Sequence, residues 1–88
     1  MLRVDEPWRV RARCFAQTDL AGAHLLGNDL EQAAAVGRDA LRTAAQVSSA
    51  RTLDRLHTLQ RQIQPLRAGS PHLRELDERI TVFLARNS

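Results

Sequence analysis

Apolar residues recur along most of the chain at steps of three and four, which is the spacing of one face of an α-helix. One of the resulting stripes consists largely of Ala and Gly, whereas two later stripes consist mainly of Leu and Ile. No segment alternates apolar and polar residues with the period of two that marks a half-buried strand. The pattern therefore predicts an all-α protein without strands.

Capping and helix-breaking residues divide this pattern into four predicted helices, over residues 7–26, 29–47, 49–66 and 71–86. Pro7 suits a first helical turn, and Gly27 suits the position just after a last turn. Ser48 or Ser49 is the expected N-cap of the third helix, and Ser70 is that of the fourth. Because the connections are short, consecutive helices should be antiparallel neighbours. We expect a single domain over residues 1–88 made of two stacked helical hairpins, with a closed four-helix bundle as the alternative.

The stretch from Gly27 to Val47 carries the small-residue stripe and is the expected centre of packing. Asn28 or Asp29 is the expected N-cap of its helix. Small side chains let neighbouring helices approach closely, so this face can receive the first helix on one side and the third on the other. The predicted packing hub consists of Leu20, Ala21, Ala33, Gly37, Ala40 and Ala44.

The other three helices each have a predicted inner face. In the first helix this face contains Trp8, Ala12, Phe15 or Ala16, Leu20 and Ala23. In the third it contains Leu53, Leu56, Leu59, Ile63 and Leu66, and in the fourth Leu73, Leu76, Ile80 and Phe83 with Leu84. Gly22, inside the first helix, can mark a close helix crossing.

One hairpin of the sequence resembles a tetratricopeptide repeat. The large–small pair Leu20-Ala21, the turn from Gly27 to Leu30, and the small crossing residues Ala33 and Ala40 have the order found in that family. His24 and Gly37 depart from it, because bulky aromatic residues are usual at those places. The resemblance implies stacked helical hairpins that recognise other proteins. Arrays of such repeats usually contain three or more, so the two hairpins here should seek a second copy, further repeats or another protein.

A longer run, from Leu26 to Phe83, resembles the C-terminal tail of large actinomycete helix-turn-helix transcriptional regulators. It combines Gly-Asn-Asp-Leu-Glu-Gln-Ala, Val-Gly-Arg-Asp-Ala-Leu, Ser-Ala-Arg and Arg-Glu-Leu-Asp-Glu-Arg-Ile. In those regulators a tetratricopeptide-like helical array follows a DNA-binding domain. The resemblance implies a non-enzymatic protein–protein interaction module, complete in itself or detached from a larger regulator. A regulator fragment that contacts nucleic-acid backbone through Arg, and a stand-alone structural bundle, remain alternatives.

The net charge of +3 is concentrated in residues 48–70, which contain four arginines and one acidic residue. The candidate protein-binding residues are Arg51, Arg55, Arg61 and Arg67. They could orient an acidic partner, or their stems could simply cover apolar surface. Nucleic acid is a disfavoured partner for this chain alone, because Glu75, Asp77 and Glu78 would face phosphates in the only hairpin resembling a helix-turn-helix. We expect these three acids to form a solvated face.

Candidate chemistry is sparse. Cys14 is the single cysteine, and His24, His57 and His72 lie on three different predicted helices without metal-ligand spacing. We therefore expect no catalytic residues, no metal, no cofactor and a buried structural thiol at Cys14.

No stretch approaches the length of a membrane span or resembles a signal peptide, and we expect a soluble cytoplasmic protein without membrane contact.

Overall fold

The computed structural model describes residues 6–47 and 49–87, with side chains from Trp8 onward. This part of the chain contains four α-helices and a short 3-10 helix: α1 (Glu6–Leu26), α2 (Leu30–Ala44), α3 (Ala50–Ile63), η2 (Arg67–Gly69) and α4 (Pro71–Asn87). No strand occurs among these residues, which confirms the all-α prediction. The second and third helices each end three residues before their predicted ends.

The turn between α1 and α2 depends on Asn28 rather than on Gly27. Asn28 adopts the left-handed conformation, with φ of 62°, whereas Gly27 has negative φ. The N–H of Asn28 donates to the carbonyl of Leu25 at 3.1 Å, and the N–H of Asp29 donates to the carbonyl of His24 at 2.8 Å. This pair of bonds is a Schellman motif, and Asn tolerates its left-handed position better than most side chains do. Asp29 is the N-cap of α2, without a side-chain hydrogen bond.

The expected serine caps are both present. Ser49 Oγ accepts a hydrogen bond from the N–H of Thr52 at 3.2 Å, and Ser70 Oγ accepts one from the N–H of Leu73 at 3.3 Å. Each bond satisfies a backbone donor in a first helical turn that has no partner within the helix. α3 ends at Ile63, two residues before Pro65, which has no N–H to continue the helical hydrogen bonds. Gln64, between them, keeps helical dihedral angles and is the C-cap.

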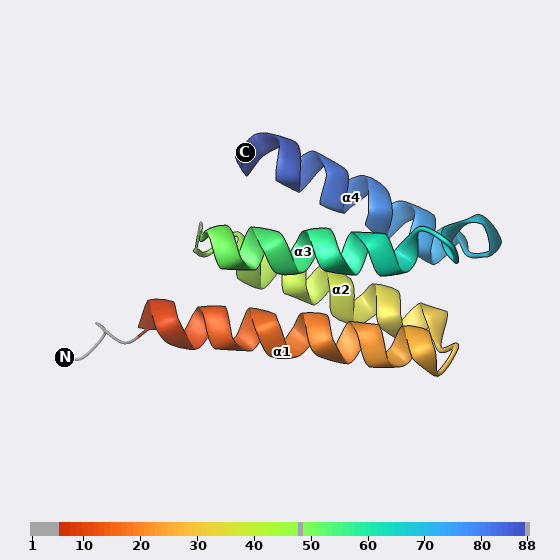
Figure 1. Cartoon of the computed structure of the whole chain (residues 1–88), viewed down its shortest axis with the longest axis horizontal. Coiled ribbons are helices and arrows are strands. Elements are labelled where there is room, and N and C mark those ends of the chain that lie inside the picture. The colour runs from red at the N-terminus through yellow and green to blue at the C-terminus, as the bar shows by residue number, and fades with distance from the viewer. Residues whose placement is uncertain (1–5, 48, 88) are drawn as a thin grey trace.

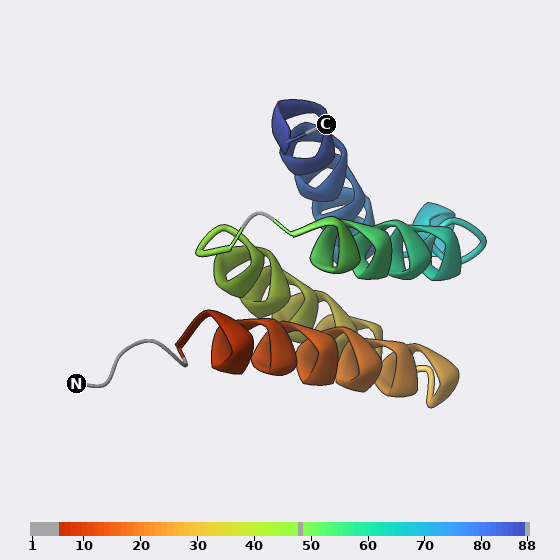
Figure 2. The same cartoon turned by 60° about the vertical axis from the view of Figure 1, so that its left-hand side comes forward.

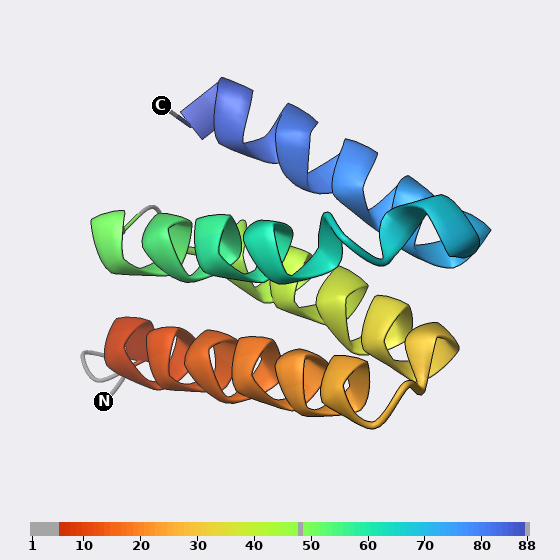
Figure 3. The ribbon, with the colours of Figure 1, turned by 45° about the vertical axis from the view of Figure 1, so that its right-hand side comes forward.

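The helices form two stacked hairpins, α1 with α2 and α3 with α4. α1 packs against α2 and also against α3, while α2 packs against α4. Figures 1 and 3 show α1 and α3 side by side and running in the same direction, with α2 behind them. In Figure 2, α4 diverges from α3 toward its C-terminal end. The described part measures 47 × 26 × 15 Å, so it is elongated and thin.

Two kinds of packing hold this arrangement together. The second hairpin is filled by large aliphatic residues, all at most 1% exposed: Leu56, Leu59, Ile63, Leu73, Leu76 and Ile80. Each such side chain contributes roughly 1.5–3 kcal/mol when it is fully buried. The face of α2 is instead built from Ala33, Ala34, Gly37, Ala40 and Ala44, all of which are buried. Small residues therefore line the helix that touches all three others.

The predicted inner face of α1 is wrong. Trp8 and Leu20 are 59% and 49% exposed, and Ala12 and Ala23 are exposed as well. The residues of α1 that are buried are Cys14, Thr18, Ala21 and Leu25. Since the facing side of α2 brings the backbones close together, the inner face of α1 has little room for large side chains. Leu20 thus lies outside the packing hub, whereas its other five predicted members are buried.

No helix in the described part of the chain is both long enough and apolar enough to span a membrane.

Candidate binding face along α1 and α3

An apolar groove of about 430 Å³ lies between the C-terminal halves of α1 and α3. Gly22, Ala23 and Leu26 line it from α1, and Leu59 with Gln62 from α3. Leu26 is 92% exposed at its rim, which is unusual for so large an apolar side chain. The groove is shaped to receive an apolar side chain from elsewhere, because its walls offer mainly hydrocarbon.

Arg55 closes one end of the apolar groove and ties α3 to α1. Its Nη1 donates to Asp19 Oδ1 at 2.8 Å, and its guanidinium carbon lies 4.7 Å from the centre of the Phe15 ring. Both contacts join the same two helices, so the side chain is held by a carboxylate and by an aromatic face at once. Because the pair is largely exposed, it adds at most about 1 kcal/mol to stability, and its main effect is to fix the position of Arg55.

Beyond Arg55 the same pair of helices carries a second hollow, here called the basic end. It has a volume of about 490 Å³ and is lined by Trp8, Arg11 and Phe15 from α1 and by Arg51 from α3. Within the described residues, neither Arg11 nor Arg51 makes an ion pair. α1 and α3 both begin at this end, so the partial positive charge of their N-termini adds to that of the two guanidinium groups.

The four arginines of the predicted protein-binding set are not brought together. Arg51 and Arg55 lie on the face formed by α1 and α3. Arg61 is exposed elsewhere on α3, where its Nη2 donates weakly to Thr58 Oγ1 at 3.4 Å. Arg67 belongs to η2 and forms an ion pair with Asp77, with 3.1 Å between Nε and Oδ2. This Nε has no hydrogen-bond partner of good geometry, so the contact is electrostatic.

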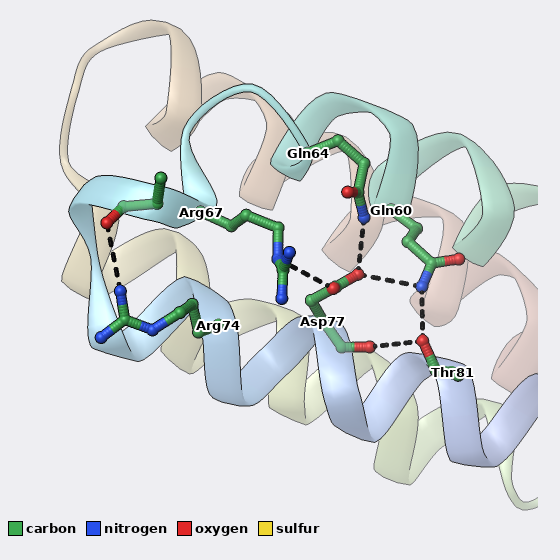
Figure 4. A network of polar contacts seen from close by, with 7 residues as sticks. Gln60, Gln64, Arg67, Arg74, Asp77 and Thr81 are labelled. Carbon is green, nitrogen blue, oxygen red and sulfur yellow. Dashed lines mark hydrogen bonds and ion pairs between the residues drawn. The ribbon is translucent and has the colours of Figure 1, made fainter.

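Asp77 is the centre of a polar network that joins α3 to α4 (Figure 4). Its Oδ1 accepts hydrogen bonds from Gln60 Nε2 at 2.9 Å and from Gln64 Nε2 at 2.8 Å. Gln60 also donates to Thr81 Oγ1 at 2.8 Å. Asp77 is only 7% exposed, so the expectation of a solvated acidic face is wrong for this residue. It holds for Glu75 and Glu78, which are exposed on the same helix.

Cys14 is fully buried, as expected for a structural thiol. Its Sγ lies 3.7 Å from the carbonyl oxygen of Ala40, to which it donates a weak hydrogen bond across the α1–α2 contact. Burial raises the pKa of the Cys14 thiol above 9.0, and the positive charge of Arg55 opposes this only in part. The thiolate that nucleophilic chemistry requires is therefore disfavoured here.

The remaining titratable residues are dispersed. His24 lies 3.8 Å from Asp29 beside the first turn, and His57 and His72 are exposed on α3 and α4. Among the described residues, no group of three or more His, Cys, Asp or Glu side chains is placed to hold a metal ion.

The apolar groove and the basic end are formed by the relative placement of α1 and α3. The apolar pattern of the sequence does not predict that placement. Gly22 was the available signal for that placement. A Cβ atom at this position would lie 3.1 Å from Gln62 Oε1 on α3.

The chain matches no protein-family model, and no curated protein and no solved structure is significantly similar to it.

Proposed function

We propose that the protein is a non-enzymatic protein–protein interaction module that binds an acidic, amphipathic partner segment along α1 and α3. The observation that carries the proposal is the continuity of two features on one pair of parallel helices. The apolar groove lies at one end of the pair, and the basic end lies at the other. A single segment lying along the pair can occupy both.

The apolar groove would supply affinity. The fold buries almost none of the Leu26 side chain. A partner side chain that covers it therefore gains hydrophobic contact without disturbing the core. Complete burial of a side chain of this size is worth about 1.5–3 kcal/mol. Anchors of this kind, placed at helical spacing, are how amphipathic helices bind in grooves.

The basic end would supply orientation. Arg11 and Arg51 are free to pair with carboxylates, while Arg55 and Arg67 already contact Asp19 and Asp77. The two arginines that line the basic end make a poor track for a phosphate backbone, and an acidic protein segment fits them better. Its acidic residues would meet Arg11 and Arg51 while its apolar residues fill the groove.

This proposal agrees with the tetratricopeptide-like resemblance. Two stacked hairpins with Ala33 and Ala40 buried at the crossing are the arrangement that this resemblance implies. The further interpretation of the chain as the helical tail of a bacterial transcriptional regulator rests on the sequence resemblance alone. In that setting the partner would be a segment of the same regulator or of a protein that controls it, and the module would act in the cytoplasm.

A displayed library of amphipathic helical peptides, selected on the full chain, tests the proposal. We expect enrichment of peptides that carry large apolar anchors next to acidic residues. Two exposed alanines offer a matched pair of variants. Ala23→Arg places a charge in the apolar groove, whereas Ala45→Arg makes the same change just after α2, at a residue that lines none of the hollows between α1 and α3.

For a selected peptide, Ala23→Arg should weaken binding by about thirtyfold, as loss of a hot-spot contact of about 2 kcal/mol does. Ala45→Arg should leave the dissociation constant unchanged, and Arg51→Glu should weaken binding most at low salt. Equal binding to the wild type and to Ala23→Arg would overturn the proposal. So would a selection in which acidic residues are not enriched.

A further inference from the structure

A third hollow lies between α2 and the C-terminal half of α4, away from the apolar groove and the basic end. It measures about 470 Å³, and its apolar part consists of Leu41, Val82 and Phe83. Val82 is 51% exposed, and Leu41 and Phe83 are half-buried. We call this hollow, with the charged residues along its α4 side, the α4 face.

The charged residues of the α4 face are ordered along the helix. Glu75 and Glu78 line its N-terminal part, and Arg79 and Arg86 line its C-terminal part. Glu75, Arg79, Val82 and Arg86 follow one another at steps of four, three and four, so they form one stripe on the helix surface. The stripe therefore begins with an acidic residue and ends with a basic one, and its exposed valine lies between Arg79 and Arg86.

Such a stripe is complementary to itself when it is turned around. If two α4 helices lie antiparallel across a two-fold axis, Glu75 of each copy faces Arg86 of the other. Val82 of each copy then faces the aliphatic stem of the other copy's Arg79, which can cover it. Closed two-fold interfaces have this property, because the same patch contributes both sides of the contact.

The existing contacts on the α4 face do not oppose this pairing. Arg79 Nη2 lies 3.3 Å from Glu75 Oε2, and both side chains are more than half exposed. Exposed pairs of this kind contribute little, so the two residues can exchange partners at small cost. Residues 71–88 carry equal numbers of acidic and basic side chains, so two copies of this segment do not repel each other although the whole chain is positive.

We propose that the protein forms a two-fold homodimer through antiparallel pairing of α4 with α4 of a second copy. This inference is independent of the proposed function, since the dimer leaves the apolar groove and the basic end uncovered. Pairing of a single helix buries a small interface, so the dimer should be weak and in exchange with monomer. The apolar stripe of α3 is unsuited to this role because Leu56, Leu59 and Ile63 are buried within the monomer.

Sedimentation velocity of the full chain, from micromolar to near-millimolar concentration, tests the dimer. We expect a concentration-dependent shift from monomer to dimer. Glu75→Arg alone should place Arg against Arg86 and weaken the dimer roughly tenfold, since two symmetric attractions become repulsions. Arg86→Glu alone should do the same by placing Glu against Glu75. The combined variant Glu75→Arg with Arg86→Glu should restore dimerisation to near the wild-type level.

Circular-dichroism melts should match the wild type, because both positions are exposed. A monomer at every concentration would overturn the inference. So would single variants that dimerise like the wild type, or a combined variant that is no better than either single change. Loss of the dimer in Ala23→Arg with retention in Val82→Asp would instead assign self-association to the apolar groove and also reject the α4 pairing.

Discussion

At the scale of single residues, Gly37 shows how closely α2 and α4 approach. A Cβ atom built on Gly37 would lie 2.5 Å from Cδ2 and 3.2 Å from Cδ1 of Leu76, which is itself buried. Neither helix can accept even one methyl group there unless the leucine or the backbone moves. The absence of a side chain at Gly37 therefore determines the spacing of the second layer of helices.

Gly37→Ala should destabilise the protein by about 1–3 kcal/mol, because overpacking outweighs the gain in helix propensity. Urea denaturation followed by circular dichroism measures this change. Gly22→Ala is the matched control, since its new methyl group meets only the end of the flexible Gln62 side chain. We expect Gly22→Ala to be neutral or stabilising by up to about 1 kcal/mol. Equal destabilisation by both variants would contradict the role assigned to Gly37.

At the scale of the elements, α3 and α4 are joined by a polar network as well as by aliphatic packing. Asp77 accepts from the side chains of Gln60 in α3 and Gln64 just after α3, and it pairs with Arg67 of η2. Without the carboxylate, the two amide groups and the guanidinium would lose their shared partner in a poorly hydrated place. The network therefore also sets the position of η2, which closes the second hairpin (Figure 4).

Asp77→Ala should lower the free energy of unfolding by about 1–3 kcal/mol, because it removes a buried carboxylate together with two part-buried hydrogen bonds and an ion pair. The neighbouring Glu78→Ala should change it by less than about 0.5 kcal/mol, because Glu78 is exposed. Both values can be obtained from urea denaturation at neutral pH. If the two variants were equally stable, Asp77 would be a surface residue in solution.

How much of this architecture the sequence predicts differs from helix to helix. The stripes of α3 and α4 are read correctly because large aliphatic residues at helical spacing have only one way to be buried together. In α1 the large residues Trp8, Leu20 and Leu26 are exposed, and the buried ones are Cys14, Thr18, Ala21 and Leu25. Choosing the inner face of a helix by its largest apolar residues therefore gives the wrong face when the partner helix presents small residues. Asp77 was misjudged for a related reason, since its donors come from residues 13 and 17 positions away.

At the scale of the whole molecule, few side chains can lose a proton at alkaline pH. The chain contains neither Lys nor Tyr. Cys14 is then the side chain expected to lose its proton as the pH rises above neutral, before the arginines do. The alkaline stability of the fold can thus be traced to one side chain.

Because burial raises the pKa of Cys14 in the folded state, the folded protein holds this proton more tightly than the unfolded chain does. Its contribution to stability is complete below the unfolded pKa and is lost as the pH rises toward the folded pKa. We expect the free energy of unfolding to fall by at most about 1.4 kcal/mol per pH unit in that window. Cys14→Ala should abolish the slope, even if it lowers stability by a constant amount. Denaturation curves across the alkaline range measure both effects, and a flat wild-type profile would contradict the assignment.

The sparse packing of α1 has a kinetic consequence. Leu25 is the only large aliphatic side chain that the described part of α1 buries, so α1 should detach at lower free-energy cost than the leucine-filled hairpin behind it. Each time it lifts, the Cys14 thiol meets water and can be alkylated. The rate at which Cys14 is alkylated therefore measures how often α1 opens, rather than the intrinsic reactivity of the thiol. A segment bound across α1 and α3 would hold α1 in place and lower the alkylation rate of Cys14. Binding could thus be followed without labelling the partner.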